Sequence, residues 1–181
     1  AMKPYVSGTG SPMYYASRIA KKKYPEAKVV FIGPCIAKRK EAQRDECVDY
    51  VMTFEELHSV FRGLGIELAQ ANPYKVAYES VCEAHGFAQA GGVAGAVKSY
   101  LGPKADGIKM LQFSDFNKKS IGQMRAWAKT GKVDAQFIEM MACEGGCITG
   151  PSTHNDIVSG KRQLNQDLLK RTLKYENYKE E

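Results

Sequence analysis

The cysteines of this 181-residue chain are the residues whose type and spacing bear most directly on chemistry. There are five of them, an odd number that excludes a complete disulfide framework and is too small for a secreted scaffold held by disulfides. We therefore expect reduced thiols, serving as metal ligands or as small buried side chains. Three of the five, Cys35, Cys143 and Cys147, stand in segments suited to binding a metal centre.

The first of these segments begins with Pro34-Cys35 and continues to Lys38, between an apolar run and a predicted helix. A cysteine near a helix N-terminus is favoured as the thiolate, which is the form that binds metals. Lys38 lies one helical turn further on and can direct its positive charge toward the same pocket. Taken alone, the segment is more simply described as a buried cysteine beside a surface lysine.

The second segment places Cys143 and Cys147 four residues apart, with Gly145 and Gly146 between them. The glycines allow the backbone to wrap closely and to aim N–H groups at sulfide or another anionic ligand. This spacing is neither that of a zinc ribbon nor that of a thioredoxin. Because two soft thiolates and a third from Cys35 suit an iron–sulfur cluster, we favour that chemistry. A redox-inert loop or a labile disulfide is the alternative.

The elements that must position these cysteines alternate between strand and helix. The pattern predicts strands over 29–32, 48–52, 109–113 and 135–140, and a loop region over 73–85. It predicts helices over 11–23, 36–44, 53–64, 93–101, 121–130 and 156–175. Ser11-Pro12 and the capping box of Thr53 and Glu56 mark two of the helix starts. The 29–32 run is continuously apolar, as in a strand buried on both faces, and Gly160 could break the last helix. We therefore predict an α/β fold with a parallel or mostly parallel sheet flanked by helices. Both cysteine segments follow strands, where ligands of such sheets bind.

Composition excludes several classes of protein. With 44% apolar and 25% charged residues the chain is typical of a globular protein, and no apolar run approaches the ~20 residues of a membrane span. No signal peptide opens the sequence, so we expect a cytoplasmic protein with no membrane partner. The net charge of +6 comes from short basic clusters without a binding motif. We expect no nucleic-acid partner, and solvated faces or a docking surface for an acidic electron carrier instead.

The two cysteine segments carry a family resemblance. The patterns P-C-x-x-K-x-x-E at 34–41 and E-x-M-A-C-x-G-G-C-x-x-G at 139–150 resemble the second and third signatures of iron-only ([FeFe]) hydrogenases, in the right order. The stretches 48–57 and 91–93 also look similar, and the likeness extends from about residue 11 to residue 157. The resemblance implies a two-lobed domain from an anaerobe, of which residues 1–181 would be a C-terminal part.

The family binds an H-cluster, a [4Fe–4S] cubane joined to a di-iron subcluster with CO, cyanide and a dithiolate bridge, and reversibly converts protons to H2. By motif position, the resemblance implies that Cys35 and Cys143 ligate the cubane and that Cys147 bridges it to the di-iron subcluster. Lys38 would bind a cyanide ligand and Met141 would pack against the di-iron site. Pro34, Gly145 and Gly146 would line the cofactor. The implied partners are H2, protons, and an electron carrier such as ferredoxin or fused iron–sulfur or regulatory domains.

The sequence also departs from the family pattern. The first signature, T-S-C-x-P-x-W, is absent; we expect it upstream, because residues 6–13 resemble the stretch that comes directly after that signature in the family. A fragment without that ligand would lack the full cluster and be inactive. We also interpret residues 1–2 as a cloning remnant and 176–181 as a frayed tail. Cys47 and Cys82, outside any signature, are expected to be structural or incidental thiols and not replacements for the missing ligand.

Other departures point to a divergent, sensory branch of the family. Gly33 stands where catalytic members carry Met, Gly95 where many carry Glu, and Pro151-Ser152 where a glycine run is usual. The alternatives to an enzyme are therefore a non-catalytic sensor of H2 or redox state, an iron–sulfur assembly or electron-transfer protein, and a zinc-stabilised scaffold. The histidines, His58, His85 and His154, have no partner at metal-ligand spacing and are expected to be structural.

Overall fold

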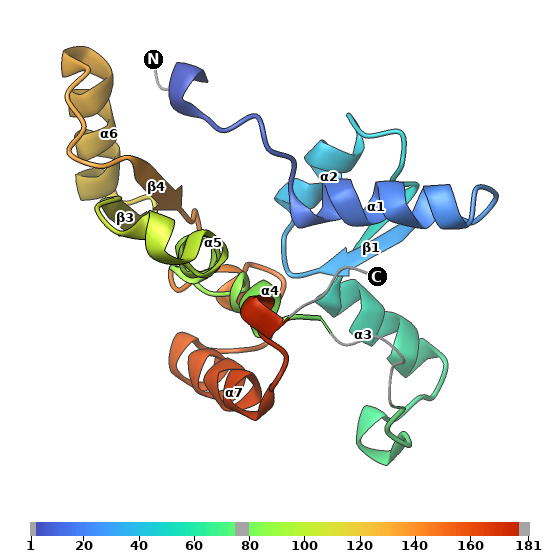
Figure 1. Ribbon diagram of the computed structural model, residues 1–181. Helices are drawn as coiled ribbons and strands as arrows, with labels where there is room; N and C mark the ends of the chain where they lie inside the picture. The colour runs from blue at the N-terminus through green and yellow to red at the C-terminus, as the bar shows by residue number, and fades with distance from the viewer. Residues whose placement is uncertain (1–2, 75–79, 178–181) are drawn as a thin grey trace. The chain divides into compact units, whose positions relative to one another are not determined.

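The computed structural model describes residues 3–74 and 80–177, which fold as two compact units (Figure 1). The N-terminal unit comprises Lys3–Pro73 with Pro151–His154. The C-terminal unit comprises the described parts of Tyr74–Gly150 and Asn155–Glu181. Each unit contains one sheet of two parallel strands, which confirms the predicted α/β class and the parallel strand direction.

The N-terminal unit is built around strands β1 and β2. Its helices and strands are α1 (Pro12–Lys23), β1 (Val30–Gly33), α2 (Ala37–Ala42), β2 (Tyr50–Thr53) and α3 (Phe54–Gly63), with 3-10 turns at Lys3–Tyr5 and Leu68–Gln70. Ser11 caps α1 by accepting a hydrogen bond from the Tyr14 N–H, as expected from Ser-Pro at a helix start. The predicted capping box between Thr53 and Glu56 is present at the start of α3. Helix α3 packs against both strands, and α1 runs alongside β1 (Figure 1).

Strand β1 corrects one expectation. Val30 and Ile32 are 44% and 41% exposed, so the strand is not buried on both faces. Alternate residues of a strand face opposite sides of its sheet. Within this unit the side that holds Phe31 and Gly33 is the better covered one, which leaves the side chains of Val30 and Ile32 in contact with solvent.

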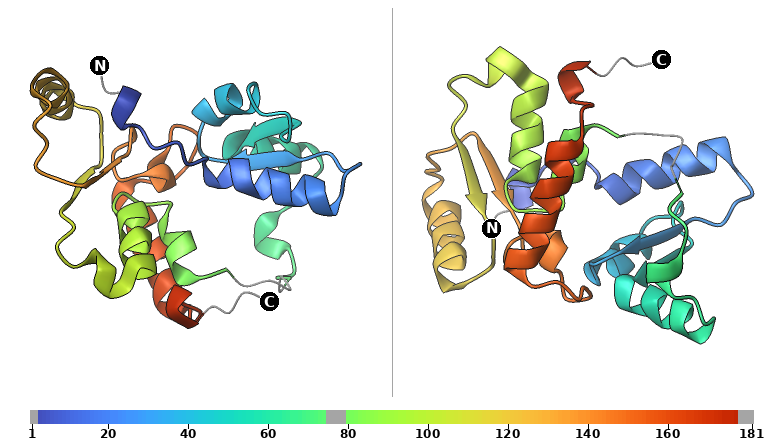
Figure 2. Two further views of the ribbon diagram at one scale, coloured as in Figure 1. Left: turned by 45° about the horizontal axis from the view of Figure 1, so that its top comes forward. Right: turned by 90° about the horizontal axis from the view of Figure 1, so that it is seen from below.

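The C-terminal unit carries the second strand pair. It comprises α4 (Cys82–Gly86), α5 (Gly92–Leu101), β3 (Met110–Phe113), α6 (Lys118–Thr130), β4 (Phe137–Met140) and α7 (Ile157–Lys170), with 3-10 turns at Gly102–Ala105, Cys147–Thr149 and Tyr175–Asn177. Helices α5 and α6 lie on opposite sides of the strands (Figure 2). Helix α5 packs against β4, and the Trp127 ring of α6 meets the Phe113 ring of β3 edge-on at 5.7 Å.

Two expectations about this unit are wrong. Part of the predicted 73–85 loop is helical, because α4 begins at Cys82; residues 75–79 of that loop lie outside the described residues. Gly160 does not break the last helix but is buried inside α7, where a Cβ would lie 3.7 Å from the Ile148 carbonyl oxygen. The helix ends at Lys170, and a separate turn follows at Tyr175–Asn177; residues 178–181 of the expected frayed tail are outside the described part.

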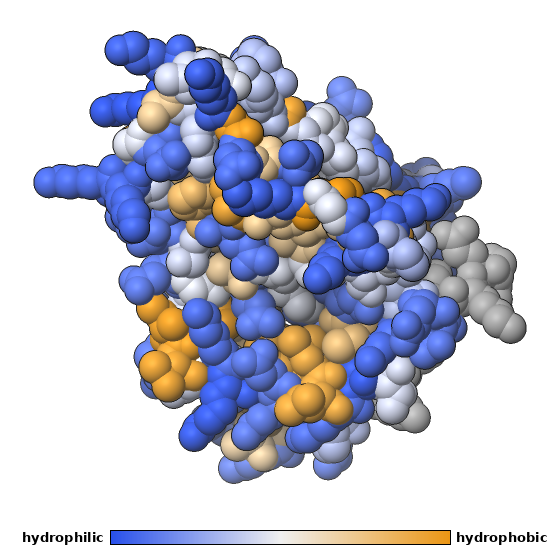
Figure 3. All heavy atoms as spheres, turned by 60° about the vertical axis from the view of Figure 1, so that its left-hand side comes forward, coloured by the Kyte–Doolittle hydropathy of each residue, from blue (hydrophilic) through white to orange (hydrophobic). Residues whose placement is uncertain are grey.

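The surface combines many hydrophilic side chains with apolar patches (Figure 3). Buried apolar residues are few among the described ones, namely Met13, Val48, Ala94, Ala105 and Trp127. No helix within residues 3–74 and 80–177 has the length and apolar character needed to cross a bilayer.

Candidate iron–sulfur cluster site

The first cysteine segment lies at the carboxyl end of β1, as predicted. Gly33 ends the strand, and Pro34 and Cys35 form the turn into α2. The Cys35 carbonyl accepts a hydrogen bond from the Lys38 N–H at 3.3 Å, so the turn winds directly into the helix. Pro34 and Cys35 are half-buried. A half-buried thiol on a short turn after a strand can act as a ligand at the sheet edge.

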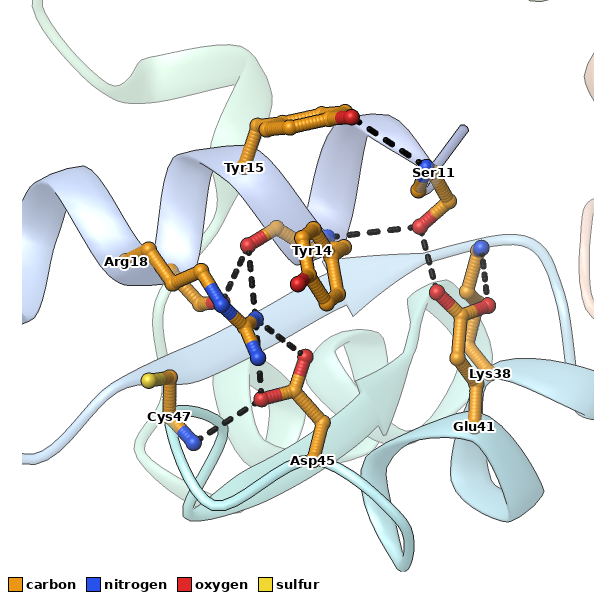
Figure 4. A network of polar contacts seen from close by, with 10 residues as sticks. Ser11, Tyr14, Tyr15, Arg18, Lys38, Glu41, Asp45 and Cys47 are labelled. Carbon is orange, nitrogen blue, oxygen red and sulfur yellow. Dashed lines mark hydrogen bonds and ion pairs between the residues drawn. The ribbon is translucent and has the colours of Figure 1, made fainter. Parts of the chain in front are cut away.

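The side chain of Lys38 takes part in a network with Glu41 and Ser11 (Figure 4). The Lys38 ammonium forms an ion pair with Glu41 Oε2, and the Ser11 hydroxyl donates to Glu41 Oε1. Partial burial acts to raise the pKa of Glu41, but the hydrogen bonds from Lys38 and Ser11 outweigh it, so the pKa lies below its usual value. Lys38 is therefore held by a carboxylate on its own helix.

A second ionic network ties α1 to the loop before β2. Arg18 Nη1 lies 2.9 Å from Asp45 Oδ2, and the Cys47 N–H donates to Asp45 Oδ1 at 3.0 Å (Figure 4). Burial acts to raise the pKa of Asp45, but the Cys47 N–H and the Arg18 guanidinium together lower it below its usual value. The backbone N–H of Cys47 thus helps to hold the loop before β2.

The second cysteine segment begins where β4 ends. The N–H of Met141, directly after the strand, donates to the Phe113 carbonyl at 2.8 Å. Two residues later, the Cys143 carbonyl accepts from the Gly146 N–H at 3.1 Å and closes a turn. Gly145 has φ 83° at the third position of this turn, a conformation that L side chains rarely adopt. Glycine is therefore required here by the turn that separates the two cysteines.

The loop of Cys143–Gly150, which we call the cysteine loop, is docked on the backbone between α4 and α5. The Ala90 N–H donates to the Gly145 carbonyl at 3.1 Å, and the Ile148 N–H donates to the Ala88 carbonyl at 2.9 Å. Gly146 has φ 103°, and a Cβ there would lie 2.6 Å from the Ala90 nitrogen. A side chain at this position would therefore push the loop off its support. Cys143 and Cys147 are both half-buried.

Glu139 in β4 supports the backbone next to the cysteine loop, a role that was not predicted from the sequence. Its side chain is 5% exposed and accepts hydrogen bonds from the Gly91 N–H at 2.9 Å and the Ala94 N–H at 2.8 Å. These donors are at the N-terminus of α5, where a carboxylate is favoured. Two signals in the sequence pointed to Glu139. It opens the 139–150 pattern, and it is an acidic residue within an apolar strand, which requires partners once it is buried.

The structure divides the expected ligands between the units. It brings Cys143 and Cys147 onto one loop of the C-terminal unit, with Met141, Gly145 and Gly146, whereas Cys35, Pro34 and Lys38 belong to the N-terminal unit. None of the five thiols forms a disulfide. Within residues 3–74 and 80–177, no three Cys, His, Asp or Glu side chains form a ready metal site. The thiol donors on strand-end turns nevertheless fit an iron–sulfur cluster, which takes soft thiolate ligands.

The remaining cysteine and the histidines have other contacts. The Cys82 thiol donates to the Leu168 carbonyl of α7 at 3.5 Å. His85 lies 2.6 Å from the Ser80 hydroxyl, measured from Nε2. The rings of His58 and His154, both in the N-terminal unit, meet edge-on at 5.7 Å. These contacts agree with the structural roles expected for these residues.

Comparisons with known proteins place the chain among hydrogenases. Residues 1–151 match the family "Iron only hydrogenase large subunit, C-terminal domain". One similar solved structure concerns oxygen inactivation of an [FeFe]-hydrogenase through its H cluster 2Fe subcluster; it is 19% identical, with a TM-score of 0.61 over 94% of this chain and 60% of that one. A second concerns stepwise H-cluster assembly in HydA(deltaEFG), with 19% identity and a TM-score of 0.61 over 96% and 61%.

A variant of the [FeFe]-hydrogenase HydA1 from Chlamydomonas reinhardtii is 21% identical, with a TM-score of 0.60 over 95% of this chain and 62% of that one. At these identities the structural matches show the fold, and the chain spans about three-fifths of the length of the solved proteins. The family match covers most of the chain and includes both cysteine segments. The chain therefore belongs to the iron-only hydrogenase large-subunit family and is a C-terminal part of its domain.

Proposed function

We propose that the chain supplies the larger part of the H-cluster site of an iron-only hydrogenase, whose reaction is 2H⁺ + 2e⁻ ⇌ H2. The observation that carries this proposal is the position of the two cysteine segments. Each follows a parallel strand, at the end of β1 and of β4, and both lie within residues 1–151, which match the family. Ligands of α/β folds bind at such strand ends.

In this proposal the half-buried thiolates of Cys35, Cys143 and Cys147 hold iron. When bound, the H-cluster supplies the electron transfer and the hydrogen chemistry, as redox cofactors generally do. The turn at Gly145 and Gly146 presents the two cysteines of the loop from a backbone that is docked at fixed points. Lys38 contributes a positive charge beside Cys35, and the Met141 side chain contributes an apolar, polarisable wall. Pro34 lines the site next to Cys35.

The chain alone is proposed to be inactive. A cubane takes four protein thiolates, whereas the matched signatures supply Cys35, Cys143 and Cys147. Hydrogen conversion would then belong to the longer protein, acting in the cytoplasm of an anaerobe with ferredoxin, or with fused iron–sulfur or regulatory domains, as its electron partner. The proposed inactivity is tested by assaying H2 evolution and uptake after loading this chain with cofactor, and detectable turnover would refute it.

Iron binding tests the ligand assignment. The chain is reconstituted anaerobically with iron and sulfide, and bound iron, acid-labile sulfide and visible absorption are measured. We expect Cys35→Ala, Cys143→Ala and Cys147→Ala each to lower bound iron, whereas Cys47→Ala and Cys82→Ala serve as matched controls that retain it. Stoichiometric zinc without sulfide, or equal losses in all five variants, would contradict the assignment.

Two glycines favour a sensory module as the second candidate function. Gly33, directly before the first cysteine segment, is buried, and a Cβ there would lie 2.8 Å from the Phe31 ring. Gly95 faces open space in α5. Neither position offers the Met or Glu side chain implied for catalytic relatives. A sensor predicts that the full-length, cluster-loaded protein changes its infrared spectrum under H2 but evolves H2 slowly, whereas fast evolution would favour the enzyme.

A further inference from the structure

Ser11 makes two hydrogen bonds in opposite directions. Its Oγ accepts the N–H of Tyr14 at 3.3 Å and so caps α1, and its hydroxyl hydrogen is donated to Glu41 Oε1 (Figure 4). A hydroxyl can do both at one atom, whereas a carboxylate accepts but cannot donate. The start of α1 is thereby joined to α2 across 30 positions of the chain.

Glu41 passes this connection on to Lys38. One carboxylate oxygen takes the Ser11 hydroxyl and the other takes the Lys38 ammonium, so the two partners fix the carboxylate from both sides. The Lys38 and Glu41 side chains are 20% and 35% exposed. In a neighbouring ion pair, between Arg39 and Glu56, both side chains are 48% exposed and are in contact with solvent. The Lys38 pair is thus the more sheltered of the two, where an ionic hydrogen bond is stronger.

We propose that Ser11 is a positioning residue for Lys38, acting through Glu41. A lysine side chain has four rotatable bonds and loses considerable freedom when its ammonium is held in one place. The Ser11 hydroxyl supplies part of that restraint, because it fixes the carboxylate to which the ammonium is bound. The ammonium is thereby kept against Glu41, on the helix that directly follows Cys35. The relevance of this restraint to the cluster rests on the proposed function, whereas the restraint itself does not.

Amine labelling of the chain without iron tests the restraint. The rate at which a small amine-reactive reagent modifies Lys38 is followed by mass spectrometry at fixed pH, with the exposed Lys40 of the same helix as internal reference. We expect Ser11→Ala and Glu41→Gln to speed labelling of Lys38 by roughly three- to tenfold, the effect of losing one hydrogen bond of typical net strength, and to leave Lys40 unchanged. Ser11→Thr, which keeps the hydroxyl, should restore the slow rate.

Two further variants separate positioning from capping. Ser11→Gly removes the hydroxyl and adds no charge, and glycine is tolerated at an N-cap at little cost, so Lys38 labelling should rise although the start of α1 is hardly weakened. Thr53→Ala removes the cap of α3 and does not touch Glu41 or Lys38, so labelling should not change. Wild-type labelling in both Ser11→Ala and Ser11→Gly, or an equal rise in Thr53→Ala, would overturn the proposal.

The consequence for the cluster is measured separately. In the full-length, cluster-loaded protein, Ser11→Ala should shift the infrared cyanide bands in the same direction as Glu41→Gln, and Ser11→Thr should restore them. If labelling of Lys38 becomes faster but the cyanide bands do not shift, Ser11 restrains Lys38 and has no role at the cluster. If the proposed function itself is wrong, Cys35→Ala, Cys143→Ala and Cys147→Ala will bind as much iron as the unchanged chain.

Discussion

Glu139 is a buried charge whose partners are backbone N–H groups. It joins β4 to the start of α5 by two hydrogen bonds, four residues before Cys143. Glu139→Gln keeps the shape, removes the charge that the helix N-terminus favours and turns an NH2 group toward an N–H donor. We expect a loss of about 1–3 kcal/mol in the free energy of unfolding, measured by denaturant titration.

Glu144→Gln is the matched control for this prediction. Glu144 lies on the same stretch of chain but is exposed, and surface substitutions of this kind change stability by about 0.5 kcal/mol or less. Similar stabilities for the two variants would show that the Glu139 carboxylate does not hold α5 in place.

Close packing of helices α4 and α5 depends on a glycine. A Cβ on Gly92 would lie 1.8 Å from the Gly86 carbonyl oxygen, whereas a Cβ on Gly95, three residues along the same helix, would meet nothing within 4 Å. Gly92→Ala should therefore lower the free energy of unfolding by about 1–3 kcal/mol, as overpacking does. Gly95→Ala should raise it by about 0.5–1 kcal/mol, because alanine favours the helix. Thermal unfolding of both variants tests whether the two substitutions change stability in opposite directions.

The cysteine loop should be equally sensitive at Gly146. Gly146→Ala places a left-handed φ and a backbone clash at one residue, whereas Gly131→Ala places only the φ of 67° at the end of α6, in open space. The backbone cost is also larger at Gly146, because its φ of 103° and ψ of −167° lie in a region open essentially to glycine alone. Gly131, at φ 67° and ψ 1°, is left-handed helical, which costs another residue about 1–2 kcal/mol. We expect Gly146→Ala to be the less stable variant and to bind less iron after reconstitution. Equal iron binding would show that this docking does not support the cysteines.

Local signals in the sequence were sufficient for the elements and for the positions of the cysteines along them. Ser11-Pro12 and Thr53-x-x-Glu56 predicted helix starts correctly because a cap involves only residues within one turn. The apolar run that forms β1 was correctly predicted as a strand. The burial of this strand was not predicted correctly, because the exposure of Val30 and Ile32 depends on which parts of the unit cover the sheet.

The contacts that support the site are long-range and were not predictable from one sequence. Glu139 and its donors at Gly91 and Ala94 lie more than 40 positions apart, and Ser11 and Glu41 lie 30 apart. Nothing in the local pattern of either segment selects the other. The roles of Cys35, Cys143 and Cys147 came from the family resemblance, and they stay predictions until iron binding is measured.

At the scale of the whole molecule, the two units should respond to acid at different pH. In the N-terminal unit, Glu41 and Asp45 have pKa values below their usual range, so their stabilisation is present above about pH 4 to 5 and is lost as the pH falls further. In the C-terminal unit, burial lowers the pKa of His85 below 6.5, and Arg171 lowers it further against the opposing effect of Asp167.

The unfolded chain therefore binds a proton at His85 more readily than the folded chain does, and stability at this site falls as the pH drops through 6.5. Between pH 7.5 and 5.5 we expect peptides of α4 and α7 to lose protection from hydrogen exchange, after correction for the intrinsic rates, whereas the start of α1 and α2 keep theirs until nearer pH 4. His85→Asn should abolish the early loss because it has no proton to gain. An unchanged loss in that variant, or an earlier loss around Glu41 and Asp45, would assign the acid sensitivity to other groups.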